Sequence, residues 1–127
     1  MNLNPEVSAY LTKAHHALKV AEKLVTGEDY ADAAGKAYYA MFYAAQALLK
    51  AHGFDVVKHS AVTSLVGREF AKTGRLDSRF HRMLINARRV RETADYGIFE
   101  DVTASTARKT LEDANSFIIE VERILQA

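Results

Sequence analysis

The chain contains no cysteine, and its 127 residues include only one proline and six glycines. Without cysteine, disulfides, thiol nucleophiles and cysteine-based zinc sites are all excluded. The scarcity of proline and glycine leaves little room for a turn-rich β architecture. No apolar run approaches the roughly 18 residues of a membrane span, and the N-terminal residues lack the pattern of a secretion signal. We therefore expect a cytoplasmic protein without a membrane-spanning segment.

What is present is ordinary for a globular protein, with 49% hydrophobic and 26% charged residues. A length of 127 residues is that of one domain large enough for a core. No linker, internal repeat or low-complexity tract divides the chain. We therefore treat residues 1–127 as a single domain.

The net charge of +1 conceals an uneven distribution. Between Lys58 and Arg91 there are nine basic and two acidic residues, whereas the rest of the chain has eight basic and fourteen acidic ones. A basic stretch in an otherwise acidic protein suggests binding of phosphate, nucleic acid or an acidic partner. The alternative is a solvated face that acidic helices neutralise in the folded protein.

Apolar residues recur at helical spacing in five segments. We expect helices over about 4–27, 29–53, 60–74, 77–97 and from 103 onward. Asn4 followed by Pro5, and Ser60, are the expected N-terminal caps of the first and third helices. No alternating β-branched run is present, and the connections are short, so we predict an all-α, up-and-down bundle of four to five antiparallel helices. The second helix is apolar around its circumference and is expected to be central.

Arg91 occupies a position of the fourth helix where the pattern calls for an apolar side chain. It follows Leu84 by seven residues, so the two lie within about 20° of each other on the helical wheel. A guanidinium stays charged, and its burial is costly unless it is paired or reaches solvent. Asp95, one turn later, is the expected partner at the mouth of a groove. The pattern allows an anion-binding site, a structural Arg–Asp pair, or an arginine that extends to the surface.

The second helix carries an aromatic run in which Tyr39 and Tyr43 form a stripe of their own. These tyrosines either belong to the core or an interface, or line a cleft against the Arg91 helix or a dimer partner. His59 lies beside Lys58 in a loop, where it either contributes to a ligand site or helps to close the next helix. The five histidines include no pair at the i, i+4 spacing of helix-borne zinc ligands, so we expect no metal site.

The segment from Ala37 to Leu49 resembles the second helix of HEPN domains (higher eukaryotes and prokaryotes nucleotide-binding). The loop with Lys58 and His59, and the segment from Arg91 to Tyr96, resemble later blocks of a prokaryotic HEPN branch. The resemblance therefore covers nearly the whole chain. It implies a bundle of four or five helices, usually dimeric and often encoded beside a minimal nucleotidyltransferase in a toxin–antitoxin or stress-response system.

Many HEPN proteins are metal-independent ribonucleases in which an arginine is followed four to six residues later by a histidine. Here Arg91 matches the arginine, Tyr96 takes the place of the histidine, and no histidine follows Arg91. Such cleavage needs a base for the 2′-hydroxyl proton, and tyrosine, with an unperturbed pKa near 10, is a poor base at neutral pH. Tyrosine can still donate a hydrogen bond to phosphate, or itself accept a nucleotidyl group from the partner. The sequence therefore favours phosphate binding over RNA cleavage.

We accordingly expect a homodimer that holds a nucleotide or RNA phosphate and acts with a minimal nucleotidyltransferase, without a cofactor. The predicted binding residues are Arg91, Asp95, Tyr96, Lys58, His59, Tyr39, Tyr43 and Arg88. Arg91 and Tyr96 are also the candidate catalytic residues. The alternative function is a metal-independent ribonuclease toxin in which Arg91, with Tyr96 or His59, acts across the dimer.

Overall fold

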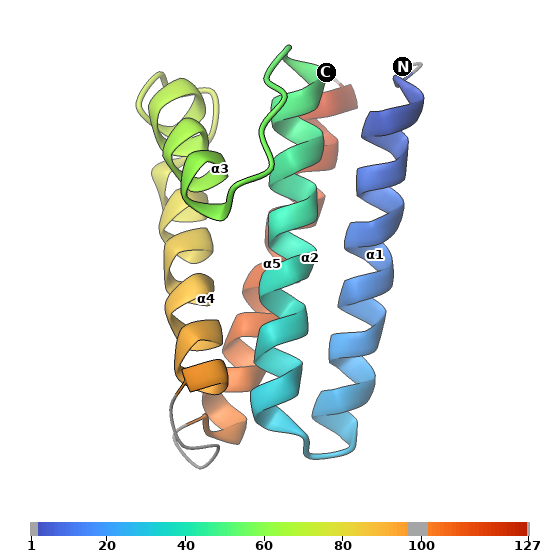
Figure 1. The fold of residues 1–127 in the computed structure, drawn as a ribbon, viewed down its shortest axis with the longest axis vertical. Coiled ribbons are helices and arrows are strands. Elements are labelled where there is room, and N and C mark those ends of the chain that lie inside the picture. Colours follow the sequence, from blue (N-terminus) through green and yellow to red (C-terminus); the bar gives the residue numbers. More distant parts are fainter. Residues whose placement is uncertain (1–2, 97–101, 127) are drawn as a thin grey trace.

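The computed structural model describes residues 3–96 and 102–126, which form a bundle of α-helices and contain no strand. The elements are α1 (Pro5–Thr26), α2 (Tyr30–Ala51), α3 (His59–Leu65), the π-helical segment η1 (Val66–Ala71), α4 (Ser78–Tyr96) and α5 (Ala104–Gln126). Figure 1 shows α1, α2, α4 and α5 as four long helices that alternate in direction, with α3 beside one end of α4. The prediction of an all-α, up-and-down bundle is confirmed.

Three long helices begin with a side-chain cap. The Oδ1 atom of Asn4 accepts a 2.7 Å hydrogen bond from the backbone of Glu6, and Pro5 is the first residue of α1, as predicted. Asp77 caps α4 in the same way at 2.9 Å, and Thr103 caps α5 at 3.1 Å. Each cap satisfies a backbone N–H group that has no partner within its helix.

The third helix begins earlier than predicted, and the expectation that Ser60 is its N-cap is wrong. Lys58 is the extended residue before α3, and its carbonyl accepts a 2.9 Å hydrogen bond from the backbone of Val62. Ser60 therefore lies inside the first turn. The reason is tertiary, because His59 is tied by its side chain to α2 and enters the helix from that fixed position.

The expected third helix is also not uniform, because after Leu65 it widens into η1. The backbone N–H of Lys72 donates to the carbonyl of Gly67, a five-residue step typical of a π-helix. The His81 ring of α4 packs directly against Gly67, where an added Cβ would lie 2.6 Å from one ring carbon. Close packing of α4 against η1 thus requires glycine at this position.

The ends of the first two helices lie close to the predicted glycines. Gly27 directly follows α1, although the residue with a left-handed backbone is Glu28, at φ 64°. Gly53, at φ 88°, lies two residues beyond the end of α2. Gly97, the expected end of the fourth helix, lies outside the described residues.

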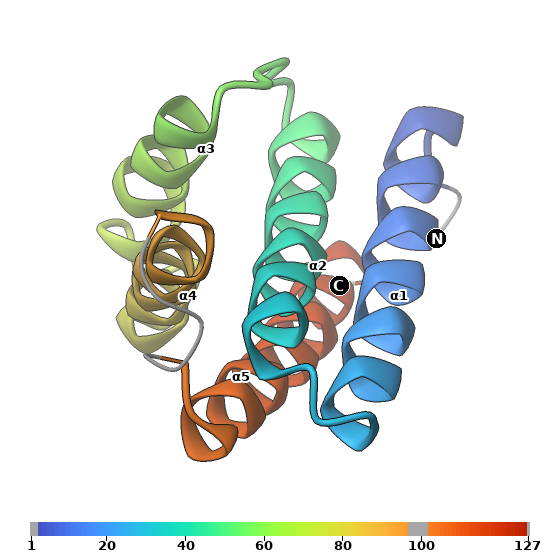
Figure 2. The ribbon, with the colours of Figure 1, turned by 60° about the horizontal axis from the view of Figure 1, so that its bottom comes forward.

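Helix α2 is central to the bundle, as its composition predicts. It contacts α1, α4 and α5, and Figures 1 and 2 both show it between α1 and α4. Fourteen of its 22 residues are buried, and eight of these are alanines that let neighbouring helices approach closely. Tyr38, Met41, Leu48 and Leu49 supply the largest buried side chains of this helix. Each contributes roughly 1.5–3 kcal/mol of hydrophobic stabilisation when fully buried.

Candidate functional site

Arg91 lies at the boundary between the buried seam of α4 and solvent. Its side chain is 23% exposed, and its Nε lies 3.0 Å from the Oδ2 of Asp95 in an ion pair. Asp95 is itself 41% exposed, so the pair expected from the sequence is present and reaches water. The two residues also line the same hollow, together with residues of α1 and α2. The charge is thus accommodated by a partner and by access to solvent.

Two tyrosines of α2 support the guanidinium. The Cζ atom of Arg91 lies 5.2 Å from the ring centroid of Tyr39 and 5.9 Å from that of Tyr38. A cation at this distance is attracted by the negative potential of an aromatic face. The central helix therefore helps to fix the position of Arg91, which α4 alone would leave mobile.

His59 is held by the same face of α2. Its Nδ1 and the hydroxyl of the fully buried Tyr38 are joined by a 2.7 Å hydrogen bond, whose donor depends on the histidine tautomer. The imidazole lies flat on Phe42, with centroids 4.0 Å apart and planes inclined by 2°. Tyr39 meets the imidazole edge-on at 5.7 Å. Three aromatic rings thus orient the first residue of α3.

Burial and the charges around His59 both favour the neutral form of its imidazole. Burial lowers the pKa of His59, and the nearby positive charges of Arg91 and Arg88 lower it further. Burial raises the pKa of Tyr38 to about 12, although the same two arginines partly offset this effect. The phenol therefore keeps its proton. The Nε2 atom of His59 makes no hydrogen bond to residues 3–96 or 102–126, so it is free for a ligand.

Arg88 adds a second guanidinium one turn before Arg91 on α4. Its Nε lies 3.4 Å from an oxygen of Glu92, and its side chain is partly exposed. Together Arg88, Arg91, His59, Tyr38 and Tyr39 form what we call the Arg91 cluster. It combines two fixed positive charges with a neutral imidazole. Such groups can bind a phosphate and move a proton beside it.

The other predicted site residues lie outside this cluster. Tyr96 ends α4 with 83% of its surface exposed, and it has no hydrogen bond or ring contact with the Arg91 cluster. Lys58 is exposed before α3. Tyr43 is half-buried and faces α1 rather than α4. The structure therefore brings together Arg88, Arg91, Asp95, His59 and Tyr39. Tyr96 lies apart from them, whereas Tyr43 contacts the ring of Tyr39 at 6.0 Å from the side of α1.

Tyr38 belongs to the Arg91 cluster, although its position in the apolar stripe of α2 predicts a core residue. It is buried, yet its hydroxyl reaches His59. One sequence feature could have identified Tyr38: it places a phenol in the middle of an apolar stripe, and a buried hydroxyl needs a hydrogen-bond partner. The sequence did not reveal that the partner is His59, since the two residues come from different helices.

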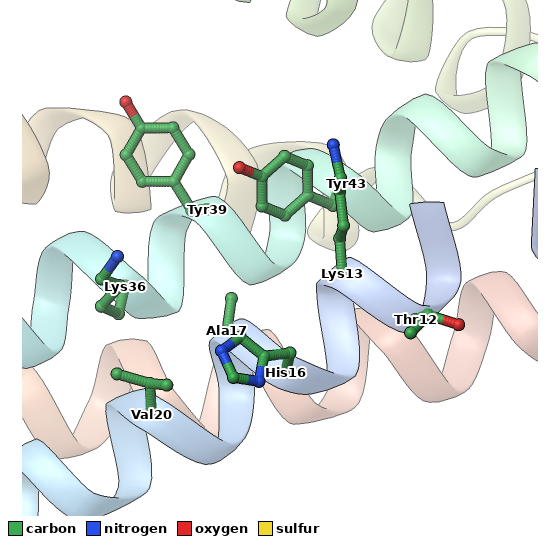
Figure 3. Close-up of a pocket in the computed structure, with 8 residues that line it drawn as sticks. All are labelled: Thr12, Lys13, His16, Ala17, Val20, Lys36, Tyr39 and Tyr43. Carbon is green, nitrogen blue, oxygen red and sulfur yellow. The ribbon is translucent and has the colours of Figure 1, made fainter. Parts of the chain in front are cut away.

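Two adjoining hollows lie next to the cluster. The first, of about 760 Å³, lies between α1 and α2 and is drawn in Figure 3. Its lining residues are Thr12, Lys13, His16, Ala17, Val20, Lys36, Tyr39 and Tyr43. The second, of about 430 Å³, includes Arg91 and Asp95. Within the described ranges, no three side chains of the histidine, aspartate and glutamate types come together in a way that could hold a metal ion.

Comparison with known proteins identifies relatives along almost the whole chain. The HEPN domain family model matches residues 7–124. A Methanocaldococcus jannaschii protein named "Putative toxin" is 31% identical over 120 residues, which are 94% of this chain and 82% of that protein. A Gloeobacter violaceus protein named "UPF0332 protein" is 32% identical over 124 residues, which are 98% of this chain and 94% of that protein. A second M. jannaschii protein, also named "Putative toxin", is 31% identical over 121 residues, which are 95% of this chain and 84% of that protein.

In the part of the chain that the structure describes, no helix is long and apolar enough to cross a membrane.

Proposed function

Because the chain belongs to the HEPN family, we propose that it binds an RNA or nucleotide phosphate at the Arg91 cluster, as a module of a toxin–antitoxin or stress-response system. The observation that carries this proposal is that Arg91 and His59 pack against the same two rings, those of Tyr38 and Tyr39. The toxin names of two relatives support the biological setting.

The ion pair with Asp95 suggests how Arg91 would meet a phosphate. Asp95 lies 3.0 Å from Nε, and the terminal nitrogens of the guanidinium make no hydrogen bond within residues 3–96 and 102–126, so they remain for a ligand. Arginine is suited to this role, because its planar fork can donate two parallel hydrogen bonds to phosphate oxygens. In this proposal Asp95 positions the guanidinium of Arg91, and the ring of Tyr39, which lies under this guanidinium, restricts its movement.

The proposal includes a homodimer and a minimal nucleotidyltransferase partner. The exposed hydroxyl of Tyr96 is the atom we assign to this partner. Its oxygen would form a bond to the α-phosphorus of ATP while the bond to pyrophosphate breaks, and the phenol proton would pass to solvent. An exposed phenol at a helix end can enter the active site of another protein without unfolding of the bundle.

Binding of RNA by matched arginine variants tests the phosphate site. We expect Arg91→Ala to weaken binding of a fluorescein-labelled RNA decamer by about 10- to 100-fold, the loss of a charge-assisted hydrogen-bonded contact. Arg89→Ala is the control, because Arg89 is exposed on the same helix outside the cluster. Circular dichroism verifies that both variants are folded. Equal affinities of the wild type and Arg91→Ala would refute the site.

The role of Tyr96 is tested by mass. After incubation with the partner and ATP, the intact mass of the wild type should increase by one or more nucleotidyl groups. Tyr96→Phe keeps the ring and removes the oxygen, so its mass should not change. An equal gain in the variant would show that another residue accepts the group.

One observation favours a second function, that of a metal-independent ribonuclease. The neutral His59 beside Arg91 provides the base that the segment after Arg91 lacks. Nε2 would take the 2′-hydroxyl proton while the 2′-oxygen bonds to phosphorus. The bond to the 5′-oxygen breaks, this oxygen takes a proton from water and leaves as a hydroxyl, and a 2′,3′-cyclic phosphate remains. Arg91 would offset the charge that develops on the phosphate. RNA cleavage in EDTA by the wild type, but not by His59→Gln, is the expected result, and intact RNA would rule this function out.

A further inference from the structure

The two hollows beside the Arg91 cluster are parts of one groove. They share the lining residues Val20, Lys36 and Tyr39. The larger hollow begins near Lys13 on α1, and the smaller one extends past Tyr39 to Arg91 on α4. We call this continuous depression the tyrosine groove.

Two aromatic rings line the tyrosine groove. Tyr39 and Tyr43 are one turn apart on α2, with ring centroids 6.0 Å apart and planes inclined by 37°. Figure 3 shows both side chains rising from the same side of the helix. Both are only half-buried, and neither hydroxyl makes a hydrogen bond to a residue in the described ranges. Exposed aromatic rings are stacking surfaces for nucleic-acid bases of any sequence.

Positive charges accompany the rings. Lys13 places its Nζ 5.6 Å from the centroid of Tyr43, and Arg91 lies 5.2 Å from that of Tyr39. Lys36 lines both hollows, and no acidic residue is among the lining residues of the larger one. Each cation lies over the face of its ring, and such pairs of ring and cation match a polymer in which bases alternate with phosphates.

We propose that the tyrosine groove binds single-stranded RNA and leads the strand to the Arg91 cluster. Bases stack on Tyr39 and Tyr43, and Lys13 and Lys36 contact the phosphates between them. This inference rests on the proposed function, because it names the path of the RNA whose phosphate Arg91 holds. The strand must be single, because the bases of a duplex are stacked inside the helix and cannot reach the rings.

The charges argue against a second copy of the chain in the groove. A two-fold contact through this surface would bring two copies of Lys13 and Lys36 together, and lysine is depleted at the centres of protein interfaces. The acidic residues Asp32 and Asp95 lie in the smaller hollow. Asp32 disfavours phosphate near the start of α2, whereas the charge of Asp95 is offset by Arg91 at 3.0 Å. The strand therefore leaves the groove along the side of Arg91.

Stacking is tested by two substitutions at Tyr43 in the full chain. Tyr43→Phe keeps the ring and should bind a fluorescein-labelled, unstructured RNA decamer within about twofold of the wild type. Tyr43→Leu removes the ring and should bind about 5- to 100-fold more weakly, because stacking contributes ~1–3 kcal/mol per base. Equal binding by Tyr43→Leu would overturn the proposal.

The phosphate contacts are tested by the dependence of affinity on salt. Lys13→Ala and Lys36→Ala should each reduce the slope of log affinity against log salt by about 0.7, the value for one contact to a single strand. Lys72→Ala is the matched control, because Lys72 is exposed after η1, outside the groove. Unchanged slopes for both groove lysines would contradict the inference.

Three further measurements identify the class of ligand and distinguish failure of the groove from failure of the phosphate site. Duplex RNA of equal length should bind at least about tenfold more weakly than the decamer, and AMP should compete poorly; the opposite result for either ligand overturns a single-strand groove. If Tyr43→Leu loses binding and also changes the mass by light scattering, the surface is an interface and the proposal is wrong. If only Arg91→Ala loses binding, the phosphate site stands and the groove fails. If no variant changes binding, both fail.

Discussion

The hydroxyl of Tyr38 and the Nδ1 of His59 are joined by a 2.7 Å hydrogen bond between the buried centre of α2 and the first residue of α3. This bond links the hydrophobic core directly to the Arg91 cluster. Tyr38 is surrounded by apolar side chains on α2, whereas His59 reaches solvent. The orientation of the imidazole is therefore determined by packing that lies outside the site itself.

Replacing Tyr38 with phenylalanine should cost about 1 kcal/mol of unfolding free energy, the net contribution of a typical hydrogen bond. The ring remains and fills the same space, so no cavity forms. Tyr43→Phe is the matched control, because its hydroxyl has no hydrogen-bond partner among the described residues, and it should change stability by less than about 0.5 kcal/mol. Urea denaturation measures both. Equal losses in the two variants would show that the Tyr38–His59 bond contributes nothing specific.

Acid should destabilise the protein through His59. In the unfolded chain this histidine titrates near 6.5, whereas burial and the two arginines lower its pKa in the folded state. As the pH falls below about 6.5, the unfolded chain takes up the proton first, so the free energy of unfolding decreases until the folded pKa is reached. The full contribution is present above pH 6.5.

Variant His59→Gln cannot titrate and should lose less stability than the wild type over this acidic range. Denaturation at pH 7.5, 6.5 and 5.5 gives the comparison, and the other four histidines are present in both proteins. Parallel pH profiles for the two proteins would contradict the lowered pKa.

Replacing Asp95 with alanine should destabilise the protein by about 1 kcal/mol or less, the usual range for a partly exposed ion pair. Glu92→Ala is the reference, because it breaks the Arg88–Glu92 ion pair, which is more exposed than the Arg91–Asp95 pair. A loss of about 3–5 kcal/mol from Asp95→Ala would instead identify a fully buried pair whose purpose is structural. Thermal and urea denaturation decide between these values.

Two glycine substitutions should change stability in opposite directions. At Gly67 the added methyl group would lie 2.6–2.8 Å from two atoms of the His81 ring, and this ring also bonds the carbonyl of Thr63 at 3.0 Å. We expect Gly67→Ala to cost about 1–3 kcal/mol through this overpacking. Gly35 in α2 has nothing within 4 Å of an added Cβ, so Gly35→Ala should add about 0.5–1 kcal/mol. Unfolding curves that rank the two variants in the reverse order would show that the α4–η1 contact is loose.

The chain should form a homodimer with two-fold symmetry. The apolar seams of α1, α2 and α5 are buried within the single bundle, so the interface must use other surface, such as Ile119 of α5, which is 59% exposed. Light scattering at micromolar concentration should give twice the chain mass of 14.1 kDa. A mass of 14.1 kDa under these conditions would exclude the dimer.

The sequence predicts the helices well because their seams are local and repeat over several turns. It fails at α3 and η1, where the boundaries depend on contacts with other helices: His59 is held by Tyr38, and Gly67 is covered by His81. A short segment has too few residues of its own to determine its ends. Its start was therefore misplaced at Ser60.

In the site, too, the sequence predicts contacts within one helix but not contacts between helices. Arg91 and Asp95 could be recognised because a charge in an apolar seam needs a partner, and one turn of helix supplies it. The roles of Tyr38, Lys13 and Lys36 could not be recognised, since they arise only when α1, α2 and α3 meet α4. Tyr96 is near Arg91 along the chain, yet it is exposed outside the cluster, and the sequence alone did not indicate this position.

The Arg91 cluster draws its side chains from α2, the start of α3 and the second half of α4. These segments are synthesised at different times. While the ribosome makes the protein, the α1–α2 hairpin is complete long before the residue on which the site centres has been added. A nascent or truncated chain that ends before Arg91 therefore lacks the complete cluster, however well its first two helices have packed.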